Sequence, residues 1–134
     1  MDTTIKAAWV AALRSGEYTQ GFQTLSKKKN SEPACHCVLG VLCELALKAD
    51  VALVKAVSFL SHHERGETTF FSYDGGEQVL PVAVQQWAGL SKGDPKVQAQ
   101  NYKTVGLTEL TALNDQDELS FVQLADLIEA DLDF

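Results

Sequence analysis

The chain has 134 residues, which is enough for one compact domain with a core and too few for two. Hydrophobic residues make up 46% and charged residues 22%, a globular composition, and no apolar run reaches the ~18 residues of a membrane span. The formal net charge of −7 argues against general nucleic-acid binding, which needs a basic surface.

The charge is distributed unevenly along the chain. Residues 1–104 carry all 11 basic residues and 10 acidic ones, whereas residues 105–134 carry eight acidic residues and no Lys or Arg. A run of acidic residues is usually a solvated face that keeps a protein soluble, and it is also suited to attract a basic partner surface. Both interpretations stay open from the sequence.

The N-terminal stretch predicts an amphipathic helix. Apolar residues recur at helical spacing from Ile5 to Leu13, Thr3 or Thr4 can cap the start, and Gly16 offers the left-handed conformation that ends a helix. An acid at position 2 and a lysine at position 6 are unlike the basic and apolar regions of a signal peptide, so none is expected.

A loop and a buried helix follow. Residues 17–33 indicate a loop with one short strand around Phe22 to Leu25 and an exposed lysine run. Residues 37–49 are apolar around most of a helical circumference, which predicts the central helix of the core. Gly40 lies inside this helix, where glycine costs up to ~1 kcal/mol relative to Ala, so we expect a close packing contact there.

The middle of the chain carries the β signal. Valines in residues 51–60 suit a helix or a strand, and we favour a helix. Residues 68–81, "TTFFSYDGGEQVLP", contain a β-rich run, an Asp-Gly-Gly turn and a second short run. Glycine supplies the positive φ angles of a tight turn, so this segment predicts a β-hairpin.

The last third predicts three helices. Residues 82–90 form a short helix after Pro81, residues 90–103 a surface connection, and residues 106–114 a second short helix. The final helix has the strongest signals, because Ser120 and Gln123 form a capping box in front of an apolar stripe. The elements together predict an α+β fold: a mainly helical single domain, residues 1–134, with one small antiparallel β-hairpin.

Metal and thiol chemistry is the first functional question that the sequence raises. The soft-ligand residue types are Cys35, His36, Cys37, Cys43, His62 and His63. A structural zinc site usually has two closely spaced pairs such as C-x₂₋₄-C, whereas the first pair here is C-x-C and the last two histidines are adjacent. The odd number of cysteines favours reduced thiols in a cytoplasm over a disulfide scaffold.

Catalysis by a thiol has only partial support. A cysteine near a helix N-terminus, as Cys37 would be, has its thiolate favoured by the helix dipole, but it also needs a base within hydrogen-bond reach. His36 is adjacent in sequence and normally points elsewhere. The segment 114–121 fails the calcium-loop template, and no Gly-rich phosphate loop is present. We therefore expect no catalytic residue, metal or cofactor, with the cysteines acting as small apolar residues.

Four blocks of the sequence carry a family resemblance. They are "WVAALRSGEYTQGFQTL", "CHCVLGVLCELA", "VLPVAVQQWAGL" and "LTALNDQDELSFVQLADLIEADL". In this order they resemble a family of small bacteriophage and prophage proteins with a "CCLGVLCDLA"-like helix and a "LND..SF..IA..IE"-like ending. The chain departs from that pattern at two places. It has His36 where the family has a cysteine, and it has Gln-Asp-Glu at residues 116–118 where the family's ending carries a glycine. The resemblance implies a viral gene expressed in the cytoplasm of an infected bacterium, and it implies no activity.

The leading hypothesis is a non-enzymatic phage accessory protein. It would bind and inhibit a host bacterial protein, such as a defence component, through an acidic surface, with no membrane and no direct nucleic-acid binding involved. The residues predicted to contact the partner are Asp115, Asp117, Glu118, Asp126, Glu129, Asp131 and Asp133.

The alternative hypothesis is a small-ligand binder that sequesters a nucleotide-derived immune signal. Basic and aromatic side chains would supply phosphate contacts and base stacking. The residues predicted for this site are Arg14, Tyr18, Lys27, Lys28, Lys29 and Tyr73.

Overall fold

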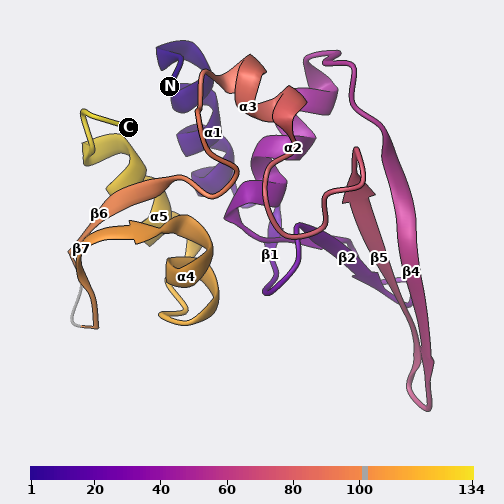
Figure 1. Ribbon diagram of the computed structural model, residues 1–134. Coiled ribbons are helices and arrows are strands. Elements are labelled where there is room, and N and C mark those ends of the chain that lie inside the picture. The colour runs from indigo at the N-terminus through magenta and orange to yellow at the C-terminus, as the bar shows by residue number, and fades with distance from the viewer. Residues whose placement is uncertain (101–102) are drawn as a thin grey trace.

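The computed structural model describes residues 1–100 and 103–134 and shows an α+β fold (Figure 1). The described residues form, in chain order, α1 (Thr3–Ser15), β1 (Thr19–Gln20), β2 (Ser26–Lys29), β3 (Cys35–His36), α2 (Val38–Lys48), β4 (Lys55–His63), β5 (Gly66–Tyr73), α3 (Val82–Ala88), β6 (Lys96–Gln100), β7 (Val105–Glu109), α4 (Leu110–Asp115) and α5 (Phe121–Ala130).

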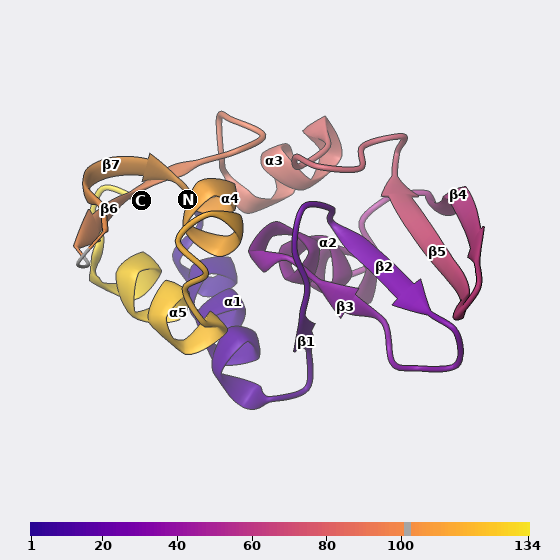
Figure 2. The ribbon, with the colours of Figure 1, turned by 90° about the horizontal axis from the view of Figure 1, so that it is seen from below.

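The strands form two sheets on opposite sides of the molecule (Figures 1 and 2). The larger sheet has the order β1-β3-β2-β5-β4, with β1 and β3 parallel and the other neighbours antiparallel. β6 and β7 form a separate antiparallel pair. The α+β class is therefore correct, but the expectation of a mainly helical domain with one small hairpin is wrong, since the described residues form a five-stranded mixed sheet and a second, two-stranded sheet.

The expected helix over residues 51–60 is also wrong. This segment contributes most of β4, which pairs with β5 through eight residue pairs from Lys55↔Tyr73 to His63↔Gly66. β-Branched and aromatic residues suit a pleated surface, and cross-strand pairing decides between the two periodicities that the valines allow. The hairpin consequently lies between β4 and β5, earlier in the chain than expected.

The Asp-Gly-Gly segment does form a tight turn. Asp74 and Gly75 both have positive φ, at 51° and 82°, and a single bridge joins Tyr73 to Gly76. Positive φ at two consecutive residues is the signature of a hairpin turn. The chain leaves the sheet after this bridge, so the second strand expected after the turn is absent from the described structure.

Two other local predictions are corrected. The strand expected around residues 22–25 begins instead at Ser26 and includes the lysine run, because β2 pairs with β5 on one side and β3 on the other. The expected surface connection over residues 90–103, of which residues 101–102 lie outside the described structure, contributes β6, and β7 occupies the start of the expected second short helix. Only α4 (Leu110–Asp115) is helical there.

The helix-end signals are mostly confirmed. α1 ends at Gly16 with φ 79°, although Asp2 rather than a threonine caps its start, its Oδ1 accepting from Ile5 N at 2.9 Å. In α5 the Ser120 hydroxyl accepts from the Gln123 backbone N–H at 3.2 Å, and the Gln123 side chain accepts from Ser120 N at 2.9 Å. Local capping geometry needs no distant partner, which is why it can be predicted from sequence.

α2 is the centre of the core, as expected. It packs against α1, α3 and α4, and it lies between the helices and the larger sheet (Figure 2). Every residue from Val38 to Cys43 is buried. Trp9 of α1 is fully buried beside it and donates its indole N–H to the Val38 carbonyl at 3.0 Å.

Gly40 confirms the expected close packing contact. A Cβ at this position would lie 1.8 Å from the backbone carbonyl oxygen of Leu25. α2 therefore approaches the chain just before β2 at a distance that only a residue without a side chain permits.

We predict that Gly40→Ala lowers the free energy of unfolding by about 3 kcal/mol, because the backbone at Leu25 must move and the gain in helix propensity is only ~1 kcal/mol. Urea denaturation followed by circular dichroism measures this. Gly75→Ala is the matched control, because a Cβ at this position would have no heavy atom of the described residues within 4 Å apart from its own chain neighbours. Its loss of unfolding free energy should therefore come from the positive φ alone and be about 1 kcal/mol. Equal losses in the two variants would contradict the packing explanation.

The buried side chain of Asn114 joins three segments. Its Oδ1 accepts from Val38 N at 3.2 Å and from the Gln20 side chain at 3.0 Å, and its Nδ2 donates to the Gly21 carbonyl at 3.0 Å. The carboxamide thus caps the N-terminus of α2 and holds β1 and the following loop against α4. The sequence indicates only that Asn114 ends a helix.

We predict that Asn114→Leu destabilises the fold by about 3 kcal/mol, because the Val38 N–H and the Gly21 carbonyl lose their buried partner. Denaturant titration checks the value, with Gln116→Ala on the exposed end of α4 as the control. A loss below about 1 kcal/mol would show that these groups find other partners.

Candidate functional site

Two adjoining cavities form a groove on one face of the molecule, and they share Gln23, Thr24 and Gln78. The first, which we call the Cys37 cavity, has a volume of about 470 Å³. The second, which we call the aromatic cavity, has a volume of about 460 Å³. Both values lie within the range of small-molecule sites in proteins.

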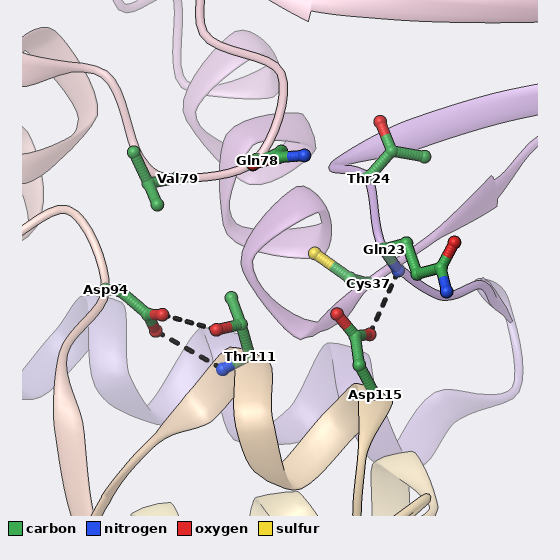
Figure 3. Close-up of a pocket in the computed structure, with 8 residues that line it drawn as sticks. All are labelled: Gln23, Thr24, Cys37, Gln78, Val79, Asp94, Thr111 and Asp115. Carbon is green, nitrogen blue, oxygen red and sulfur yellow. Dashed lines mark hydrogen bonds between the residues drawn. The ribbon is translucent and has the colours of Figure 1, made fainter.

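The Cys37 cavity lies where α4, the start of α2 and three loops meet (Figure 3). Its sulfur comes from the residue that precedes α2, and its carboxylates come from the loop before β6 and from the end of α4. The lining residues are Gln23, Thr24, Cys37, Gln78, Val79, Asp94, Thr111 and Asp115.

Both carboxylates in this cavity already hold the fold. Asp94 accepts from the Thr111 backbone N–H at 3.2 Å and from the Thr111 hydroxyl. Partial burial raises the pKa of the Asp94 carboxyl. Asp115 accepts from the Gln23 N–H at 3.0 Å and from the Asn114 side chain at 2.7 Å.

The Cys37 thiol is protonated, and therefore neutral, at physiological pH. Burial raises its pKa to about 11, and the backbone N–H groups of Gly40 and Leu39 offset this only in part. The position of Cys37 at the N-terminus of α2 therefore does not lower its pKa enough to give a thiolate at neutral pH. No histidine lines the cavity, so its lining residues offer the thiol no imidazole base.

The other soft-ligand residues do not line this cavity. His36 is buried with its ring 5.7 Å from that of Tyr18, and burial lowers its pKa. Burial likewise raises the pKa of Cys43. His62 and His63 lie at the far end of β4. Within residues 1–100 and 103–134, no group of three or more His, Cys, Asp or Glu residues is placed to hold a metal ion.

We predict that one thiol reacts rapidly with Ellman's reagent in the native protein at pH 8. That thiol is Cys35, which is half-buried, whereas Cys37 and Cys43 are buried. At pH 8 only about one in a thousand Cys37 groups is ionised, and the thiolate is the reactive form. All three react once the chain is unfolded, and Cys35→Ser removes the rapid phase. A rapid phase that survives in Cys35→Ser would indicate an activated thiol.

The aromatic cavity lies on the face of the larger sheet that points away from α2. It is lined by Phe22, Gln23, Thr24, Lys27, Phe59, Ser61, Phe70, Glu77 and Gln78. The side chain of Phe59 is 60% exposed and that of Phe22 is 40% exposed. The sequence prediction missed Phe59 because it assigned residues 51–60 to a helix, and a strand pattern over residues 55–63 is the signal that would have found it. It missed Phe22 because it placed this residue in a short strand rather than in the loop before β2.

The seven acidic residues predicted to contact a partner do not form one patch. Asp115 belongs to the Cys37 cavity, while Asp117 and Glu118 lie in the turn between α4 and α5. Arg14 of α1 binds Asp126 at 2.7 Å and Glu129 at 3.0 Å. These two α5 carboxylates remain more than half exposed but already share a cation.

The remaining two of these acids lie at the C-terminal end of α5. Asp131 Oδ2 accepts from Gln98 N of β6 at 3.0 Å, and its Oδ1 accepts from Asp133 N at 3.0 Å. Asp131 therefore connects α5 to the small sheet, in addition to any role at the surface.

The residues predicted for a small ligand are also dispersed. Arg14 pairs with α5, and Lys48 Nζ lies 5.2 Å from the centre of the Tyr18 ring. Tyr73 is fully buried and donates its hydroxyl to Glu44 at 3.0 Å. Of the lysine run only Lys27 lines the aromatic cavity; Lys28 and Lys29 are the exposed residues that follow it in β2.

The fold and the groove define a small α+β domain with an open, partly aromatic surface site and with structural carboxylates beside a neutral thiol. The model of a family described as a domain of unknown function, DUF8296, matches residues 1–132, so the chain belongs to that family. No curated protein and no solved structure is significantly similar to the chain. None of the helices in the described residues has the length and apolar character needed to span a bilayer.

Proposed function

We propose that the chain is a non-enzymatic accessory protein of a bacteriophage that binds and inhibits a protein of the bacterial host, such as a defence component. The resemblance of four sequence blocks to phage proteins motivates the host target. The raised pKa of Cys37, with no imidazole lining its cavity, supports a binding role over thiol catalysis. The observation that carries the proposal is the outer strand of the larger sheet.

β4 is the outer strand of the larger sheet. It has nine residues, its strand partner among the described residues is β5, and the hairpin extends well beyond α2 (Figures 1 and 2). Natural edge strands are normally blunted by prolines, charges, β-bulges or cover from another element, because an open edge pairs with other chains. Residues 56–61 contain no charge and no proline, and the protective irregularity of this edge is the shift of register between Val57 and Phe59.

The edge is flanked by apolar side chains on the α2 side. Val57 and Leu60 are opposite Phe71 and Thr69 of β5, which places both on that face, and they are 59% and 43% exposed. Lys55 at the base of the strand is held by Glu44 at 3.1 Å, so the free part begins after it. This combination fits a partner that adds an extended strand to β4 through main-chain hydrogen bonds and covers Val57 and Leu60.

The acidic residues supply the second component of the proposal. Helix α5, which carries Asp126 and Glu129, lies on the side of the molecule opposite the hairpin (Figures 1 and 2), whereas Asp115 lines the Cys37 cavity. The acidic residues therefore act mainly through the long-range field of a chain with net charge −7. Such a field accelerates association with a basic partner and depends on salt, whereas buried apolar contacts set the dissociation rate. The partner is thus expected to be a basic protein that presents an extended segment.

The test is affinity capture from host lysate followed by binding kinetics with the purified partner. We predict that Val57→Lys with Leu60→Lys weakens binding at least tenfold through faster dissociation. Val105→Lys is the matched control, since Val105 is an exposed strand valine of the small sheet at 81% exposure. Glu118→Lys with Asp133→Lys should slow association and reduce its salt dependence.

The outcomes separate the two surfaces. If the acidic variants abolish binding and the β4 variants do not, the acidic residues form the contact and β4 does not. If neither pair changes affinity or rates, or if Val105→Lys weakens binding as much as the β4 pair does, the proposal fails.

A further inference from the structure

The aromatic cavity brings a cation and aromatic rings into one row across three strands. Lys27 of β2 is opposite Phe70 of β5, and Phe70 is opposite Phe59 of β4. Directly opposed residues of antiparallel strands point to the same face, so the three side chains lie side by side. The rings of Phe59 and Phe70 are 6.0 Å apart between centres. Phe22, from the loop before β2, also lines the cavity.

Three of the polar side chains that line this cavity, those of Lys27, Gln23 and Gln78, have no hydrogen-bond or ion-pair partner among the described residues, whereas the Thr24 hydroxyl donates to the Glu77 carbonyl at 3.0 Å. Glu77 adds one carboxylate. A concave apolar surface with a few free polar groups is the general form of a small-ligand site.

We infer that the aromatic cavity binds a nucleoside monophosphate or a cyclic mononucleotide, with the base stacked on Phe59 and Phe70 and the phosphate at Lys27. Aromatic side chains accept the π-face of any base, and carboxamides pair with base edges. Lysine binds phosphate as a point charge, and a single ammonium matches a single phosphate. Glu77 suits an amino-bearing base such as adenine, because a carboxylate accepts from an exocyclic N–H.

A free nucleotide fits better than a nucleic-acid strand. The cavity of about 460 Å³ is within the range of sites for single small ligands, and the net charge of −7 disfavours a polyanion. This inference does not rest on the proposed function, because it uses the face of the hairpin opposite Val57 and Leu60. The two can therefore fail separately.

The test is isothermal titration calorimetry with adenosine monophosphate, cyclic AMP, adenosine and inorganic phosphate. We predict that the nucleotides bind, that adenosine binds about tenfold more weakly, and that phosphate alone gives no measurable binding. Lys27→Ala should lower nucleotide affinity about tenfold without changing adenosine binding. Phe59→Ala should weaken nucleotides and adenosine alike, because it removes the stacking surface.

The control is Lys28→Ala, the neighbouring lysine whose β2 position places it on the opposite face of the sheet. Its nucleotide affinity should equal that of the wild type, and circular dichroism should show that every variant is folded. The inference is overturned if no nucleotide gives heat at millimolar concentration, or if Lys28→Ala and Lys27→Ala have equal effects. It is also overturned if a single-stranded oligonucleotide binds far more tightly than the mononucleotides.

Discussion

The carboxamide of Asn114 is the contact on which the arrangement of the molecule depends. It is fully buried, caps the first free N–H of α2 at Val38, and holds the carbonyl of Gly21 at the end of β1. A buried backbone group without a partner is costly, so this one side chain fixes where α4, α2 and the larger sheet meet. Its neighbour Asp115 then positions Gln23, which both cavities share.

A second constraint determines how far the hairpin extends from the body. Glu44 of α2 accepts from Lys55 at 3.1 Å and from the Tyr73 hydroxyl at 3.0 Å, at the base of β4 and the end of β5. Further along the hairpin, Val57 and Leu60 on the α2 side are 59% and 43% exposed, and the opposite face contributes Phe59 and Phe70 to the aromatic cavity. The groove and the free edge are thus two consequences of a sheet that is longer than the helix that covers it.

The parts of the fold that were predictable are the ones with local causes. The capping box at Ser120 and the left-handed conformation of Gly16 depend on residues within one helical turn, and the structure confirms both predictions. Gly40 implied a close contact because glycine is unfavourable in a helix, and the Leu25 carbonyl is that contact. β4 could not be assigned this way, because its valines allow two periodicities and only pairing with β5 selects one.

By itself the sequence determined the Gly16 end of α1, the capping box of α5, the buried character of α2 with Cys37 and Cys43, and the net charge of −7. These follow from spacing, capping and composition, which act over a few residues. The tertiary structure decided that Arg14 pairs with the acids of α5, and that Lys27 lies beside Phe70. Both contacts join segments that are far apart in the chain. Strand register and tertiary packing bring these segments together, and no local sequence pattern encodes either of them.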